Sequence, residues 1–163
     1  MSFFTETIEK SPKFMSIAQV RDLNLLEPGF RSDVLAFITD AKALGRQLFV
    51  AETYRSVERQ MHLANEGLTE LRHVGVHHYG LAVDLGLSVA GHYDPRGQDY
   101  SFFVGLARKH RIVSGINWGE PSTSHSFHDW DHVQRIPLHR QAALFAGTWF
   151  PPSDYDPYQD GAS

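Results

Sequence analysis

Residues 77–87 read HHYGLAVDLGL, so a pair of histidines leads into a run in which apolar residues alternate with small or polar ones. A period of two is typical of a β-strand, and it places Asp84 on one face of that strand. Gly80 and Ala82 lie between His77 and Asp84 and are small enough to leave room for an ion. The stretch therefore predicts that a histidine and a carboxylate approach one another near the start of a strand.

A second polar stretch, FHDWDHVQ, occupies residues 127–134. We expect a short strand over residues 130–134, which carries His132, and Asp129 lies three positions before that histidine. Six of the ten histidines fall near these two stretches: His73, His77, His78, His125, His128 and His132. This clustering is the main chemical signal in the sequence, because an isolated histidine is more often a surface or core residue than a ligand.

Two imidazoles and one carboxylate, from His77, Asp84 and His132, would form a three-ligand site with a fourth position open for water, as catalytic zinc sites require. A metal ion there would lower the pKa of bound water toward roughly 7. A carboxylate is then needed to accept the water's proton and pass it to the leaving amine. Asp129 is the candidate for this general base, because its offset of three lets it face the same pocket, and Asp131 is its rival.

The remaining sequence alternates between helical and strand patterns without a regular βαβ rhythm. We expect helices over residues 16–24, 32–44, 56–65, 98–110 and 137–145, and strands over residues 47–53, 81–87 and 130–134. Residues 27–29 (Glu-Pro-Gly) are expected to separate the first two helices, residues 71–80 to form a loop, and residues 88–98 to form a turn-rich connection. The pattern predicts the α+β class: a single small domain with an antiparallel or mixed sheet flanked by helices. We assign residues 1–150 to this domain and expect residues 151–163, with three prolines and three aspartates, to be a loosely ordered tail.

Composition excludes several classes of protein. The 163 residues include no cysteine, which excludes a disulfide framework, thiolate metal sites, iron–sulfur clusters and a cysteine nucleophile. A formal net charge of −4 gives no reason to expect nucleic-acid binding. No apolar run approaches the length of a membrane span, and acidic residues interrupt the start of the chain, so we expect no membrane insertion, no secretory signal and a location in the cytoplasm at synthesis. We expect a monomer.

The pattern His77-x-x-Gly80-x-Ala82-x-Asp84, followed by Asp129-x-x-His132, resembles the zinc peptidases of the D-alanyl-D-alanine carboxypeptidase and L-alanyl-D-glutamate endopeptidase family. This family includes vancomycin-resistance D,D-peptidases and several phage endolysins. Upstream, residues 54–56 (Tyr-Arg-Ser) and residues 59–60 (Arg-Gln) resemble the Tyr-Arg-Ser…Gln block of the family, and the resemblance spans residues 28–134. It implies the small α+β fold shared with the hedgehog signalling domain.

The resemblance also implies roles for single residues. His77, Asp84 and His132 would bind one zinc ion, and Asp129 would be the general base. Arg55 would steady the substrate carbonyl as it becomes an oxyanion.

Four further residues are candidates for contact with the substrate: Tyr54, Gln60, Trp118 and His128. The sequence departs from the family pattern at Gly75, where the family usually has a serine that can hydrogen-bond behind the first histidine.

The implied substrate is the stem peptide of peptidoglycan. The aspartate at position 129, where the D,D-peptidase branch often has glutamate, favours an L-alanyl-D-glutamate endopeptidase, endolysin-like, that reaches the cell wall after release. The alternative within the family is a D,D-carboxypeptidase or dipeptidase.

Other readings of these residues remain open at this point. Arg55 could form only a structural salt bridge, to Glu52 or Glu58. The pair His92-x-Asp94, with His132 or His139 downstream, matches the ligand set of a non-haem iron oxygenase, although those enzymes need a many-stranded jelly roll. A zinc-binding module without hydrolytic activity is the third alternative.

Overall fold

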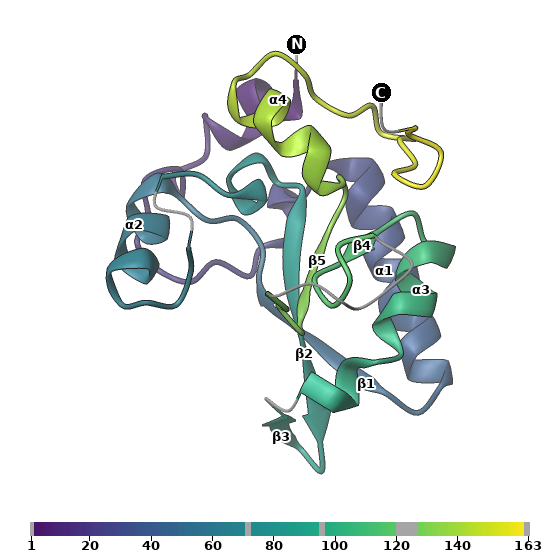
Figure 1. The fold of residues 1–163 in the computed structure, drawn as a ribbon. Helices are drawn as coiled ribbons and strands as arrows, with labels where there is room; N and C mark the ends of the chain where they lie inside the picture. The colour runs from purple at the N-terminus through teal and green to yellow at the C-terminus, as the bar shows by residue number, and fades with distance from the viewer. Residues whose placement is uncertain (1, 71–72, 95–96, 120–126, 162–163) are drawn as a thin grey trace.

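A computed structural model describes residues 2–70, 73–94, 97–119 and 127–161 (Figure 1). Within these ranges the chain forms a five-stranded antiparallel sheet in the order β1-β2-β5-β4, with β3 paired to β2 outside that path. The strands are β1 (Gln47–Glu52), β2 (Ala82–Val89), β3 (His92–Asp94), β4 (Val113–Ser114) and β5 (His132–Gln134). The α-helices are α1 (Pro28–Ala43), α2 (Val57–Asn65), α3 (Phe103–Lys109) and α4 (Gln141–Phe145). Shorter helical turns cover Phe4–Ile8, Leu23–Leu25, Val76–Tyr79, Gly97–Tyr100 and Leu138–Arg140. The predicted α+β class is confirmed.

The main hydrophobic core lies between the sheet and helices α1 and α3, which lie on the same side of it (Figure 1). Val83 and Leu85 of β2 point into this core, where Phe37 of α1 meets Phe103 of α3 edge to face with ring centroids 5.0 Å apart. Because side chains alternate along a strand, Asp84 points to the opposite face. Strand β2 thus anchors the core with one face and offers the other face for a site.

Helix α1 begins at Pro28, four residues earlier than predicted. The carboxylate of Glu27 accepts a hydrogen bond from the backbone N–H of Phe30 at 2.9 Å and caps the helix. Proline is favoured at the first helical position, because its missing N–H would have no partner there and its φ already suits the helix. The Glu-Pro-Gly sequence therefore starts the helix, where we expected it to interrupt the chain.

The helix predicted over residues 16–24 is wrong. Only Leu23–Leu25 forms a turn of 3-10 helix, and the residues before it run beside the end of β1. The carbonyl of Val20 accepts a hydrogen bond from Thr53 N–H at 2.7 Å, and the side-chain amide of Gln19 donates to the carbonyl of Ala51 at 2.7 Å. These long-range bonds outweigh the weak helical spacing of three apolar residues.

Other predicted elements are confirmed with changes at their ends. Helix α2 starts after Ser56, whose hydroxyl accepts from the N–H of Arg59 at 3.0 Å, as the cap prediction requires. The connection predicted over residues 88–98 contains strand β3, because Ala90 and Gly91 have φ of 51° and 81° and form the kind of two-residue turn that closes a hairpin. The helices predicted over residues 98–110 and 137–145 each begin as a 3-10 turn before α3 and α4.

The C-terminal segment packs against the domain, in contrast to the loose order expected for it. Arg140 holds the carboxylate of Asp160 with two hydrogen bonds of 2.6 and 2.7 Å, and the hydroxyl of Tyr158 donates to the carbonyl of Ile112 at 2.7 Å. The guanidinium of Arg135, which is fully buried, donates to the carbonyl of Tyr155 at 3.2 Å. The last two positions, 162–163, lie outside the described residues. Among the described helices, none has the length and apolar character needed to cross a membrane.

Candidate metal centre

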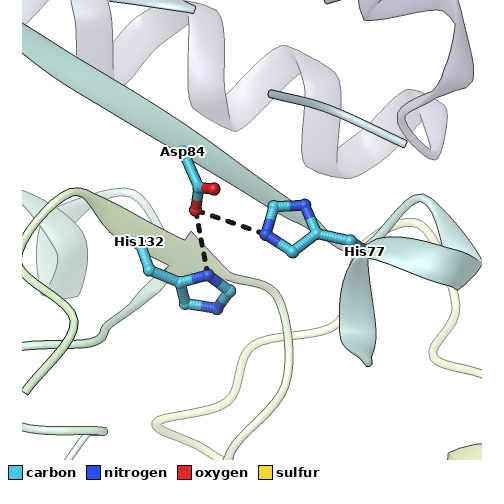
Figure 2. Close-up of side chains that lie close together, drawn as sticks. All are labelled: His77, Asp84 and His132. Carbon is cyan, nitrogen blue, oxygen red and sulfur yellow. Dashed lines mark hydrogen bonds and ion pairs between the residues drawn. The ribbon is translucent and has the colours of Figure 1, made fainter. Parts of the chain in front are cut away.

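His77, Asp84 and His132 meet in the structure although His132 lies 48 residues after Asp84 in the sequence (Figure 2). Nε2 of His77 and Nδ1 of His132 each lie 3.2 Å from the same carboxylate oxygen, Oδ1 of Asp84. The three candidate ligand atoms all lie within 4.8 Å of one another. We refer to these residues below as the metal trio. The structure brings together all three predicted ligands.

Strand pairing explains how the trio forms. Asp84 of β2 is directly opposite His132 of β5, and on its other side it is opposite Glu52 of β1. Residues directly opposite one another in antiparallel strands point to the same face, so Glu52, Asp84 and His132 form one row across three strands. A shift in register between Val50 and Glu52 brings Glu52 into this row.

His77 reaches the row from the 3-10 turn Val76–Tyr79, which ends at Gly80 with φ of 69°. Glycine adopts this left-handed conformation without strain. A Cβ at position 80 would also lie 2.5 Å from the carbonyl oxygen of Leu25. The turn directs the ring of His77 inward, where its Nδ1 pairs with the backbone carbonyl of Thr53 at 2.7 Å.

The trio fits a metal ion such as zinc. Nε2 of His77 is buried and has no hydrogen-bond partner, although it faces Asp84 Oδ1 at 3.2 Å. A buried polar atom without a partner is costly, and a metal ion beside it would supply one. Two imidazole nitrogens and one carboxylate oxygen are the donors found in catalytic zinc sites, which keep a further position open.

The negative charge of Asp84 dominates the electrostatics of the trio. Burial by itself would raise the pKa of Asp84, but His77 and His132 outweigh burial and hold the pKa well below its ordinary value. Burial likewise opposes the charged form of His132, yet the hydrogen bond to Asp84 and the charges of Asp129 and Asp84 raise the pKa of His132 to about 9. Asp84 is thus an ionised carboxylate ready to bind a cation.

Arg55 lies beside the trio and joins three acceptors. Its Nη2 is 2.9 Å from Glu52 and 3.2 Å from Oδ2 of Asp84, and its Nη1 is 3.3 Å from the side-chain oxygen of Gln60. Burial disfavours the charge on the guanidinium, but Asp84 and Glu52 outweigh it and raise the pKa of Arg55. The salt bridge to Glu52 considered from the sequence therefore exists, and it places Arg55 against a metal ligand.

Two carboxylates, Asp129 and Asp131, precede His132. Asp129 lines the same cleft as the trio, and its backbone is fixed by a hydrogen bond from its N–H to the carbonyl of Gly115 at 2.9 Å. Burial, together with the charges of Asp84 and Asp129, raises the pKa of Asp131 to about 8. The side chain of Asp131 does not line the cleft and instead accepts from the hydroxyl of Tyr93 at 3.4 Å. This geometry favours Asp129 over Asp131 as the group that faces a substrate.

The metal trio, Arg55 and Asp129 share a cleft of about 480 Å³. Its other described walls are Glu52, Gln60, Leu63, Leu68, Thr69, Glu70, Gly75, Val76, Trp118, Phe127, Gln134, Leu138 and Gln141.

The residues predicted to contact substrate divide into two pairs. Gln60 and Trp118 line the cleft, and the indole of Trp118 stacks on Phe127 with an interplanar angle of 17°. Tyr54 and His128 are not part of its wall. Tyr54 is fully buried and its hydroxyl donates to the carbonyl of Phe14 at 2.7 Å, so it serves the core.

His128 contacts other parts of the fold. Its Nδ1 pairs with the backbone carbonyl of Ile116, and its ring stacks on Trp130 with centroids 5.2 Å apart. The expectation of substrate contact at Tyr54 and His128 is therefore corrected, because neither residue lines the cleft.

The cleft residues that were not identified as site residues from the sequence include Glu52, Phe127 and Gln134. Glu52 is buried at the end of β1, where it accepts hydrogen bonds from Arg55 and Arg59. The sequence signal for Glu52 is a charged residue at the end of an apolar strand. Its place beside Asp84 depends on a strand register that cannot be read from one sequence.

The iron oxygenase alternative finds no support in the described residues. The only group of histidine and acidic side chains there that could hold a metal is the metal trio. His92 lies on the short strand β3, where it is opposite Val89 at the end of β2. The side chain of Asp94 lies outside what the structure describes. The five-stranded sheet is also smaller than the many-stranded jelly roll that those enzymes need.

No protein-family model matches the sequence, and no curated protein is similar to it at a significant level. Several solved structures share its fold. The L-Ala-D-Glu endopeptidase ChiX of Serratia marcescens aligns over 73% of this chain and 90% of its own, with 18% identity and a TM-score of 0.57.

Two structures of vancomycin-resistance enzymes are also similar. The VanY D,D-pentapeptidase in complex with Zn(II), an E175A mutant, aligns over 67% of this chain and 71% of its own, with 18% identity and a TM-score of 0.51. VanYB in complex with D-alanine-D-alanine aligns over 75% of this chain and 77% of its own, with 17% identity and a TM-score of 0.52. The fold implied by the sequence resemblance is confirmed: this chain has the fold of the L-Ala-D-Glu endopeptidase and D,D-pentapeptidase structures.

Proposed function

We propose that the protein is a zinc-dependent peptidoglycan peptidase that hydrolyses an amide bond of the stem peptide. The observation that carries this proposal is the convergence of the metal trio, Arg55 and Asp129 in one cleft. The fold shared with a peptidase whose structure holds Zn(II) supports the choice of metal and of reaction.

The proposed mechanism assigns one task to each group. Zinc held by His77, Asp84 and His132 would act as a Lewis acid and supply a water of lowered pKa. Asp129 takes a proton from the attacking water as the oxygen of that water bonds to the carbonyl carbon of the substrate. The guanidinium of Arg55 stabilises the negative charge that develops on the carbonyl oxygen. The carbon–nitrogen bond then breaks, and Asp129 returns the proton to the leaving amine.

Within this class we propose cleavage between L-alanine and D-glutamate. The endopeptidase of that specificity is the neighbour with the greatest coverage of its own chain among those compared, at 90%. A carboxypeptidase must also receive a terminal carboxylate, and a cation is the usual partner for it. Among the described residues that line the cleft, Arg55 is the only lysine or arginine, and the mechanism above assigns it to the carbonyl oxygen.

Digestion of purified peptidoglycan tests the proposal. The full-length protein is assayed with zinc, after chelation, and after zinc is restored, and fragments are identified by mass spectrometry together with their new amino termini. Release of fragments that begin with D-glutamate, restored by zinc, is the expected result. Loss of terminal D-alanine alone would assign the protein to the D,D-carboxypeptidase branch. Zinc binding without any cleavage would identify a non-catalytic zinc-binding module and contradict the proposal.

The proposal includes an endolysin-like role, in which the protein acts as a monomer on the wall after release from the cell. Addition of the protein to cells with a permeabilised outer membrane should then lower their turbidity. Light scattering coupled to gel filtration should give the 18.5 kDa mass of one chain. Intact cells under these conditions, alongside purified walls that are digested, would contradict the lytic role and leave the peptidase activity in place.

A further inference from the structure

Gln134 lies on β5 two residues after His132, so both side chains point to the same face of the sheet. It is almost completely buried and contributes to the wall of the cleft. The mechanism proposed above gives it no task. Its contacts with the metal trio, however, are specific.

The side-chain oxygen of Gln134 lies 2.8 Å from Nε2 of His132. An amide oxygen only accepts hydrogen bonds, so this contact requires a proton on Nε2. The amide could in principle be turned around, which would place its NH2 group against the ring. The carbonyl of Ile136 decides the orientation, because it lies 2.6 Å from the side-chain nitrogen of Gln134 and can only accept. The amide nitrogen therefore faces Ile136 and the amide oxygen faces His132.

A proton on Nε2 leaves Nδ1 as the nitrogen of His132 that can bind a metal. Nδ1 is the atom that faces Oδ1 of Asp84 at 3.2 Å. His77 shows the same arrangement with its nitrogens exchanged, since its Nδ1 lies 2.7 Å from the carbonyl of Thr53 and its Nε2 faces Asp84. Each ring of the trio thus has a hydrogen-bond acceptor behind it. For His77 this acceptor is backbone, and for His132 it is a side chain that can be replaced.

We infer that Gln134 is a positioning residue, which holds the proton of His132 on Nε2 and directs Nδ1 to the metal. This inference rests on the proposed function only for the identity of the metal as zinc. Acceptors behind metal-binding histidines fix the orientation of the ring and raise its basicity, and their loss typically costs about 10- to 100-fold in metal affinity. The same loss is expected when Gln134 is replaced by a side chain of similar size that cannot accept.

The experiment compares the full-length protein with Gln134→Met, Gln134→Glu and Val133→Ala. Zinc affinity is measured by competition with a chelator, and ¹⁵N NMR of the zinc-loaded protein identifies which nitrogen of His132 carries the proton. Val133 is the matched control, because it is a buried residue on the same strand that faces the core. The Val133→Ala variant removes core packing and should lower stability, but it does not change the side chains that contact the ring of His132.

The wild type should show the proton of His132 on Nε2, protected from exchange with water. Gln134→Met should lose about 10- to 100-fold in zinc affinity and lose that protection. Gln134→Glu keeps an acceptor toward His132 but loses the donor to the carbonyl of Ile136, so its zinc affinity should lie between those of Gln134→Met and the wild type. Val133→Ala should bind zinc like the wild type. A wild-type proton on Nδ1 would overturn the inference, even if the Met variant failed to fold. The inference would also be overturned if Gln134→Met bound zinc with wild-type affinity, or if Gln134→Met and Val133→Ala lost the same amount of zinc affinity. None of these readouts requires peptidase activity, so failure of the proposed function would show separately.

Discussion

Arg55 and Asp84 form an ion pair in which Nη2 lies 3.2 Å from Oδ2, while Oδ1 of the same carboxylate faces His77 and His132. The two oxygens of Asp84 therefore have different partners. One is directed to the metal position, and the other is tied to the guanidinium that we propose as the oxyanion partner. The ion pair therefore fixes the distance between the metal position and the guanidinium of Arg55 before any substrate binds.

Arg55→Ala should lower kcat by about 100- to 1,000-fold, which is the usual cost of removing one group that stabilises an oxyanion. Zinc content should stay near that of the wild type, because both histidines and Asp84 remain. Steady-state kinetics on soluble stem-peptide fragments and metal analysis check this. Arg59→Ala is the matched control, since Arg59 also pairs with Glu52 but does not line the cleft. Equal losses in both variants would show that Arg55 acts only by holding Glu52.

Asp129→Asn should lower kcat by about 100- to 10,000-fold, the usual contribution of a general base, and leave zinc bound. Asp131→Asn should lower it much less, because the side chain of Asp131 lies outside the cleft. The two variants are compared by kinetics and metal analysis, with Glu66→Gln, an exposed residue directly after the end of α2, as a control for the loss of one carboxylate. A larger loss in Asp131→Asn would reverse the assignment of the base.

Removal of zinc should lower the stability of the fold. A ligand that binds only the folded state, at a free concentration about 1,000 times its Kd, stabilises that state by about 4 kcal/mol. The melting temperature should therefore fall on chelation and return with zinc. In Asp84→Asn this dependence on zinc should disappear, whereas His139→Ala, which removes a histidine that pairs with Asp160 and does not line the cleft, should keep it. A zinc-dependent melting temperature in Asp84→Asn would place the metal elsewhere.

Much of the fold and site was predictable because the signals were local. The alternation in β2 and the cap at Ser56 needed only a few neighbouring residues, and the sequence patterns identified the metal trio. The sequence pattern does not predict the start of α1, because a Glu-Pro-Gly sequence usually indicates a break, whereas here Glu27 supplies the cap. The partners of Tyr54 could not be predicted, since its hydroxyl meets a carbonyl 40 residues away in the sequence.

Gly80→Ala should destabilise the protein by about 2–4 kcal/mol, because it combines a positive φ with a close approach to the carbonyl of Leu25. Gly91 is the matched control. Its φ of 81° is also positive, but nothing lies within 4 Å of a Cβ built there. Gly91→Ala should therefore cost only about 1 kcal/mol, the strain of the left-handed backbone. Urea unfolding of both variants measures the difference, and equal losses would show that the contact with Leu25 relaxes freely.

Asp33→Asn should destabilise the protein by about 3 kcal/mol. Asp33 accepts a hydrogen bond of 2.8 Å from the fully buried guanidinium of Arg135, and the variant leaves that buried charge without a counter-ion. Asp22→Asn breaks the more exposed pair with Lys13 and should cost less than about 1 kcal/mol. Unfolding in urea compares the two. If Asp33→Asn cost no more than Asp22→Asn, the backbone carbonyls around Arg135 would suffice to stabilise its charge.

The row of Glu52, Asp84 and His132 across three strands determines which changes in chain length this protein can tolerate. Asp84 and His132 are opposite one another at one end of a three-residue ladder, and β3, α3 and β4, which lie between them in the sequence, are not part of that ladder. Insertions or deletions in those connecting segments leave the ladder intact. A single residue inserted within residues 82–84 would turn Asp84 to the core face and separate it from both histidines. Homologues should therefore vary in length between β3 and β5, while the spacing from His77 to Asp84 stays constant.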